Sequence, residues 1–449
     1  MKDNLVQEQE TLKNGDENGP LEPENERKIG SSQGDSAELG LKEIELVVPD
    51  SNITPDGLVR NEKDAKNTIE LFKKAEIRGL LIGTMTFGEE LPTMSIAEAF
   101  SQFPIMLFGT KEGPFTSEGN RLSDSFCGTL SASSGLYRRK IKFGFAGIVF
   151  PEENAFKQKV RDFAAACLAA NGFVGARIGQ VGPRPAPFET CAINEVMLIE
   201  KFRQRVIPLT LADAFYQANL IDENDNEIKS IVAEIRQGID CSKVPPESIL
   251  KAARLEKVLS DFIAKEDLCC LGVQCWTAMQ EIFGISSCLS MGRLTEKGYP
   301  AACEVDLHGA LTMLAQYLCS FKTTPPHFID WTIPSQEKEN LFLAWHCGNV
   351  PSCLAAPGSR PQVDKHSILL SDTSYGTLEF PLKSGVVTLS RLAEYDGQFK
   401  MLITTGQIVE DKRRLRGSWS WVEVDDLEKL YETLVYEGFI HHASLTLQR

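Results

Sequence analysis

Two carboxylates, those of Glu304 and Asp330, lie in or directly after predicted strands, where they could act as metal ligands or as acid–base groups. Glu304 directly follows the apolar run "AAC", and just after it begins a helix that Asp306 could cap. Glu304 is therefore expected at the carboxyl edge of a strand, where α/β proteins build their sites. A carboxylate in this position can be a metal ligand or an acid–base group, or it can merely decorate the end of the helix.

The second carboxylate, Asp330, lies inside the apolar strand "FIDWTI". An unpaired buried carboxylate is costly, so Asp330 needs a partner. That partner is either an arginine, for instance Arg293, or a cation that Asp330 shares with Glu304.

Histidines follow these acids along the chain. A hairpin joining 327–333 to 340–347 would bring His346 near Asp330, although a lone histidine in a strand can equally be a core residue. Strand alternation is expected to turn Cys347 away from His346, which argues against a Cys–His nucleophile. The same alternation allows only one of His441 and His442 to face a given site.

Two carboxylates and two imidazoles form a nitrogen and oxygen donor set that suits a divalent cation of the Mn²⁺ type with open coordination positions. Gln274 and Trp276 leave a buried strand in "VQCWTAMQ", where they could contact a sugar or pack in a core. The chain contains no G-x-G-x-x-G, no phosphate-binding P-loop and no G-x-S-x-G motif, so the common nucleotide-binding loops and nucleophile elbow are unsupported.

The predicted secondary structure changes near residue 325, from strands that alternate with helices to strands that follow one another. Before it, buried strands alternate with helices, which predicts parallel sheets covered on both faces. After it, the period is two, which predicts antiparallel strands. The expected strands are 43–49, 79–85, 104–110, 141–150, 175–181, 267–276, 300–303, 327–333, 341–347, 376–382, 385–392 and 399–409, and the expected helices are 62–77, 95–103, 153–171, 191–203, 247–265, one from 276, 306–318 and 425–437.

The predicted fold is α/β, with two tandem doubly wound α/β domains followed by a β-rich C-terminal domain. The predicted boundaries are a disordered acidic tail over 1–40, an N-terminal α/β domain over 41–150, a central α/β domain over 151–325 and a β-rich domain over 326–449. The tail is polar and has too few apolar residues to bury.

Composition narrows the class of protein. The net charge is −15 over 449 residues, and residues 1–50 hold 13 acidic against 5 basic side chains, so the body is only mildly acidic and has no basic stripe. This argues against a nucleic-acid partner. We expect no membrane span and no secretory signal, a cytoplasmic location, and 12 cysteines that are mostly buried and reduced.

Six segments in order resemble the L-fucose/L-arabinose isomerase-like family over roughly residues 45–449: "GARIGQVGPRPAPFET", "GVQCWTAMQ", "ACEVDLHGALTM", "FIDW", "WHCGNVP" and "HHASL". The wording of "CEVD" and "WHCGNVP" is similar to a less characterised branch of that family. The resemblance assigns metal binding to Glu304, Asp330, His346 and His442, with Glu304 and Asp330 also catalytic. It assigns substrate binding to Gln274, Trp276 and Arg184, the last in the shared motif "GPRP".

The resemblance implies an aldose–ketose isomerase that needs Mn²⁺, or another divalent cation such as Co²⁺ or Mg²⁺, and works through a cis-enediol. Its substrate would be a pentose, a 6-deoxyhexose or a C6-modified hexose such as a sulfonated one. It also implies a homo-oligomer, a trimer or hexamer. A metal-dependent epimerase or aldolase and a non-catalytic sugar-binding protein are the alternatives.

Overall fold

The computed structural model describes residues 27–30, 44–369, 371, 373–411 and 413–448. Most of the predicted acidic tail over 1–40 lies outside these residues. Arg27–Gly30 is the exception, because it forms strand β1 between two other strands of the first sheet, which corrects the prediction of a tail without structure there.

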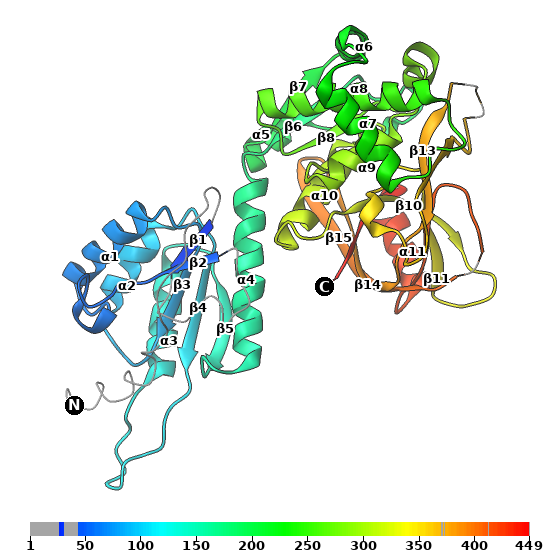
Figure 1. Cartoon of the computed structure of the whole chain (residues 1–449). Coiled ribbons are helices and arrows are strands. Elements are labelled where there is room, and N and C mark those ends of the chain that lie inside the picture. The colour runs from blue at the N-terminus through cyan, green and yellow to red at the C-terminus, as the bar shows by residue number, and fades with distance from the viewer. Residues whose placement is uncertain (1–26, 31–43, 370, 372, 412, 449) are drawn as a thin grey trace.

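The N-terminal lobe is a parallel sheet with helices on both faces (Figure 1). Along β4, Leu107 packs with the helices α1 to α3, whereas its neighbours Met106 and Phe108 pack against α4 on the other face. The sheet order is β2-β1-β3-β4-β5. Its elements are β1 (Arg27–Gly30), β2 (Ile44–Val47), α1 (Glu62–Lys74), β3 (Leu80–Thr84), α2 (Glu90–Ala99), β4 (Ile105–Thr110), α3 (Ser125–Arg138), β5 (Gly144–Val149) and α4 (Asn154–Phe173).

The central part is a second parallel sheet, with strand order β7-β6-β8-β9. Figure 1 shows α4 running between the two lobes, and this helix packs against α10 of the second lobe. The elements are β6 (Arg177–Val181), α5 (Glu195–Phe202), β7 (Arg205–Leu209), α6 (Leu211–Leu220), α7 (Asn226–Gly238), α8 (Pro246–Glu266), β8 (Cys270–Val273), α9 (Cys288–Glu296), β9 (Ala301–Cys303) and α10 (Leu307–Cys319).

The central lobe differs locally from the sequence prediction. β7, α6 and α7 were not predicted, although Thr210 and Asp225 cap the two helices with side-chain hydrogen bonds typical of a helix start. The helix predicted over 191–203 begins only at Glu195, because Asn194 caps it and a 3-10 turn precedes it. The helix predicted from 276 is a π-helical turn, Met279–Phe283, followed by α9.

The C-terminal part is a sheet that closes on itself, antiparallel except where β13 pairs with β16 in parallel. β11 pairs with β10 at one side and with β16 at the other, so the strands β11-β10-β17-β14-β15-β16 form a ring, and β13 and β12 extend from β16. The elements are β10 (His327–Pro334), β11 (Leu341–His346), β12 (Gln362–Lys365), β13 (Tyr375–Pro381), β14 (Gly385–Tyr395), β15 (Gln398–Val409), β16 (Ser418–Glu423), α11 (Leu427–Tyr436) and β17 (His442–Leu447). The predicted class, two α/β units followed by a β-rich part, is confirmed.

β17 is the element of this part that matters most for the site. No strand was predicted there, but β17 lies between β10 and β14 in the middle of the sheet. All six of its residues are buried. In the described part of the chain, no helix is long and apolar enough to span a bilayer.

Candidate functional site

Glu304 leaves the carboxyl end of β9 through a tight turn. Glu304 and Val305 both have left-handed backbone conformations, with φ of 59° and 55°. The turn lies close against β8, where a Cβ on Gly272 would come within 3.0 Å of Val305 Cα. The residue that ends the turn, Asp306, caps α10, because its Oδ1 accepts a hydrogen bond from the Gly309 amide at 2.8 Å. Glu304 thus occupies the strand-edge position that the sequence predicted.

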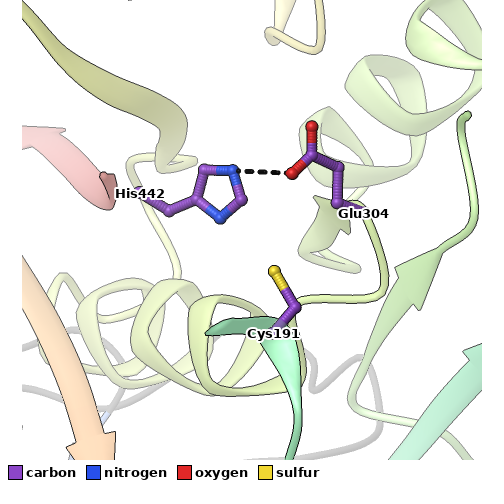
Figure 2. A group of neighbouring side chains, drawn as sticks. All are labelled: Cys191, Glu304 and His442. Atoms are coloured by element: carbon purple, nitrogen blue, oxygen red, sulfur yellow. Dashed lines mark ion pairs between the residues drawn. The ribbon is translucent and has the colours of Figure 1, made fainter. Parts of the chain in front are cut away.

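Asp330 and His442 come together through strand register. They are directly opposed in the antiparallel pair β10–β17, and residues opposed in this way have side chains on the same face. His442 Nε2 is 3.7 Å from Asp330 Oδ1. The same nitrogen is 3.2 Å from Glu304 Oε2, and Figure 2 shows this contact. Three of the predicted site residues therefore converge on one point.

The carboxylate oxygens at this point lack hydrogen bonds. Glu304 Oε2 and Asp330 Oδ1 are both buried and have no hydrogen-bond partner among the described residues. Buried carboxylate oxygens without partners are costly unless a cation or a proton compensates them. Two such oxygens facing one imidazole nitrogen are a donor set that fits a divalent cation.

A buried ion pair fixes the ring of His442. Its Nδ1 lies 2.9 Å from Asp306 Oδ2, and the same carboxylate forms a two-point ion pair with Arg391, whose Nη2 is 3.0 Å from Oδ1. Because a carboxylate accepts at Nδ1, the ring presents its Nε2 to Glu304 and Asp330. Although burial would raise it, the Arg391 charge and the His442 contact hold the pKa of Asp306 well below its usual range.

Protonation at the site is set by burial and by these charges. Burial raises the pKa of Asp330 to about 6, against the opposing effect of His346 and His442. Burial alone would lower the pKa of His442, but its contacts with Asp306, Cys191 and Glu304 raise that pKa well above the usual value. A cation that binds here must therefore displace protons.

One testable consequence concerns metal affinity and pH. In the metal-free protein the Asp330 carboxyl is protonated below about pH 6 and ionised above it, so binding releases one proton more below this pH than above it. We expect Mn²⁺ affinity to rise with pH on both sides of pH 6, but less steeply above it. The slope of log affinity against pH should be smaller by about one above pH 6, which is about tenfold less gain in affinity per pH unit. Chelator competition between about pH 5 and pH 8 measures it. Asp330→Asn should lack this break, and a wild-type curve with none would contradict the assignment.

Two residues of the site were not predicted. Cys191, at the end of the 3-10 turn Glu189–Cys191, places its sulfur with Glu304 and His442 in a group whose ligand atoms all lie within 4.8 Å of one another. His441 forms a similar group with Asp330 and His442, and its Nε2 is 3.9 Å from Glu304 Oε2. The expectation that only one of the two histidines faces the site is wrong, because His441 precedes β17 and strand alternation does not apply to it.

His346 lies next to this group rather than in it. Its ring packs edge-on against Phe328 with centroids 5.4 Å apart, and the same phenylalanine contacts His442 at 4.7 Å. Its Nδ1 accepts a hydrogen bond from the Asn349 amide at 3.3 Å. Cys347 does not turn away as expected, since its sulfur is 3.6 Å from His346 Nδ1; β11 ends at His346, so alternation ends there too.

Asp330 is not paired with Arg293. That arginine lies at Glu256, with Nε 2.6 Å from Oε2, and at Glu234, with Nη2 2.7 Å from Oε2. The alternative partner for Asp330, a site shared with Glu304, is the one that the geometry favours.

The proposed sugar-contacting residues lie at the carboxyl ends of β8 and β6. Gln274 Nε2 donates to the Trp276 carbonyl at 3.3 Å, while its Oε1 is buried without a partner. The Trp276 ring contacts Phe188 at 5.9 Å. Arg184 donates only to the neighbouring carbonyls of Pro185 and Ala186, and no ion pair of Arg184 occurs among the described residues.

The loop over 182–191 connects these side chains to the acid–histidine group. It begins at Gly182, which lies against Gln274. It passes Arg184 and packs Phe188 on Trp276 before it ends at Cys191. This loop thus carries a cation, an aromatic ring and a thiol, and its last residue reaches Glu304 and His442.

Comparisons with known proteins find similar proteins over most of the chain. Residues 36–174 match the family model described as the fucose/sulfoquinovose isomerase N-terminal domain. The chain is 25% identical to a sulfoquinovose isomerase of Priestia aryabhattai over 399 residues, which cover 88% of this chain and 86% of the relative. It is 24% identical to a sulfoquinovose isomerase of Alkalicoccus urumqiensis over 366 residues, 81% of this chain and 80% of the relative. These matches support a fucose isomerase-like family for this chain.

Proposed function

We propose that this protein is a divalent-metal-dependent aldose–ketose isomerase that acts on a sulfonated sugar. The observation that carries the proposal is the convergence of two buried carboxylate oxygens, from Glu304 and Asp330, on the Nε2 atom of His442, with no hydrogen bond to either oxygen from the described residues. The names of the relatives support the reaction and the sulfonated substrate.

Isomerisation moves a hydrogen between C1 and C2 of the sugar and needs a base for a weakly acidic C–H beside a carbonyl. Glu304 takes this proton and returns it to the neighbouring carbon. Asp330 handles the hydroxyl proton. When bound, the divalent cation polarises the carbonyl and stabilises negative charge on the sugar oxygens.

Glu304, Asp330 and His442 would hold the cation, and Asp306 with Arg391 keeps the His442 ring in place. Gln274 offers the free Oε1 acceptor for a sugar hydroxyl, and Trp276 offers an aromatic face. A sulfonate needs a cation at the far end of the sugar. Arg184 is suited to that role, because it lies on the loop that ends at Cys191 and is not committed to a carboxylate.

The test is a panel of neutral and sulfonated aldoses incubated with Mn²⁺ in deuterated water and followed by NMR. The proposal expects deuterium at C1 or C2 and a ketose product from a sulfonated aldose. Shorter fragments would indicate an aldolase, a change of configuration without a ketose would indicate an epimerase, and binding without product would indicate a sugar-binding protein.

A second prediction concerns the sulfonate. Arg184→Gln should lower kcat/KM for a sulfonated aldose by roughly 10- to 100-fold, since a hydrogen bond to a charged group contributes about 1.5 to 3 kcal/mol. A neutral aldose, if it reacts, should be affected much less. Arg205→Gln is the matched control, because Arg205 is exposed at the opposite, amino end of the same sheet. Equal losses for the two kinds of sugar would contradict the assignment.

A further inference from the structure

We propose that Cys191 supplies a sulfur ligand to the metal ion of this site, so that the site prefers thiophilic divalent cations such as Zn²⁺ and Co²⁺ to Mg²⁺. The inference rests on the proposed function, because it takes the metal site at Glu304, Asp330 and His442 as its starting point. It adds a residue that the resemblance to the isomerase family did not supply.

The Cys191 sulfur is buried beside Glu304 and His442. Cys191 is 3% exposed, and its sulfur, a Glu304 oxygen and a His442 nitrogen all lie within 4.8 Å of one another. Ligands around one ion at metal–ligand distances of 2.0 to 2.3 Å lie at most about 4.6 Å apart, so small movements suffice for all three to reach it. Figure 2 shows the sulfur directed toward the space between the Glu304 carboxylate and the His442 ring.

The hydrogen bonds around Cys191, Glu304 and His442 leave their donor atoms available to a metal ion. Glu304 Oε2 has no hydrogen-bond partner, so the Cys191 thiol does not donate to it, although both are buried side by side. His442 Nδ1 is engaged by Asp306, which leaves only Nε2 to face the group. The group thus consists of one oxygen of Glu304, one nitrogen of His442 and the sulfur of Cys191. No hydrogen bond joins the oxygen to the sulfur.

Ligand chemistry gives the consequence. On binding, the S–H bond breaks, a metal–sulfur bond forms and the proton passes to solvent, with no change of oxidation state. Sulfur binds Zn²⁺ and Co²⁺ well and Mg²⁺ poorly, whereas carboxylates accept all three. Cys191 lies on the buried side of the site, and Asp330 with His441 lies on the more open side, which leaves the open side to the sugar oxygens.

The experiment uses the full-length protein, stripped with a chelator and reloaded with Co²⁺ at one equivalent. A sulfur ligand gives a sulfur-to-cobalt charge-transfer band in the near ultraviolet, which should be present in the wild type and lost in both Cys191→Ser and Cys191→Ala. X-ray absorption of the Zn²⁺ form should show a sulfur neighbour at about 2.3 Å that disappears in the same variants.

The matched control is Cys288→Ala. Cys288 is a buried thiol 4.0 Å from Cys347, in a second group of cysteines that could also collect metal. The charge-transfer band should survive this change. A band that persists in Cys191→Ala and vanishes in Cys288→Ala would overturn the proposal.

Competition between metal ions measures the relative affinities for Zn²⁺ and Mg²⁺ independently of the spectra. Zn²⁺ affinity should fall at least about tenfold in Cys191→Ala, and Mg²⁺ affinity should change less. Tenfold is the smallest usual loss of metal affinity when a residue that only hydrogen-bonds to a ligand is removed, and loss of a ligand itself should cost at least as much. If Co²⁺ and Zn²⁺ bind with nitrogen and oxygen neighbours alone and Asp330→Asn abolishes that binding, the metal site of the proposed function stands and the Cys191 ligand is refuted. If neither ion binds at all, both fail.

Discussion

Glu304→Gln is expected to lower kcat/KM for a sulfonated aldose, the proposed substrate, by roughly 10²- to 10⁴-fold, the usual contribution of a positioned acid–base group. The amide has the shape of the carboxylate but cannot accept the carbon-bound proton. Glu304 is confined by the left-handed turn and by the adjacent strand, so a side chain of the same shape should leave the fold intact. Initial rates, circular dichroism and Mn²⁺ titration of the variant measure the three quantities.

The control for Glu304→Gln is Glu281→Gln, a loss of the same charge at an exposed position on the π-helical turn of the same lobe. This variant should keep wild-type kinetics. Wild-type turnover by Glu304→Gln would mean that another group takes the carbon-bound proton. A loss of rate accompanied by loss of structure would instead show that Glu304 is needed for folding.

Arg391→Met is expected to lower the free energy of unfolding of the second lobe by about 3 to 5 kcal/mol, because it leaves a buried carboxylate without its cation. Arg391 is 2% exposed and Asp306 is 1% exposed, and Asp306 also caps α10 and holds His442. All five tryptophans lie between 276 and 421, so tryptophan fluorescence during urea unfolding reports on this lobe.

Two further variants test the origin of this loss. In Asp306→Asn/Arg391→Met the unpaired charge is gone, so part of the stability should return. Arg177→Met removes a pair with Glu266 that is about 30% exposed, and it should change stability by less than about 1 kcal/mol. A cost for Arg391→Met no larger than that for Arg177→Met would show that the buried pair does not stabilise the lobe.

The sequence predicted the fold class well where the periodicity was strong. The buried strands at Leu80–Thr84 and Ile105–Thr110 are continuous apolar runs, and the C-terminal strands alternate with a period of two. Arg205–Leu209 was missed because charged and apolar residues mix in it and the burial of a strand depends on what packs over it.

The site was predicted in part. Glu304 was predictable because a strand end followed by a capped helix is a local pattern, and Asp306 does cap that helix. The approach of Asp330 to His442 depends on β17 entering the sheet beside β10, a pairing across more than a hundred residues that only the family resemblance suggested. The alternation rule misplaced His441 and Cys347 because each lies one residue beyond the end of a strand.

Cys191 could not have been found from the sequence. It lies in a 3-10 turn without a motif of its own, and its neighbours Glu304 and His442 are more than a hundred residues away along the chain. Only the path of the loop over 182–191 brings it to them.

The position of β17 also couples assembly of the barrel to assembly of the site. β17 is the last strand of the ring in chain order, it is inserted between β10 and β14, and its first residue is His442. Contacts this distant in sequence form late, since the loop entropy must be overcome first. We therefore expect the ring to close and the imidazole to reach the two carboxylates in the same event, so that metal binding at the proposed site would require a completed barrel.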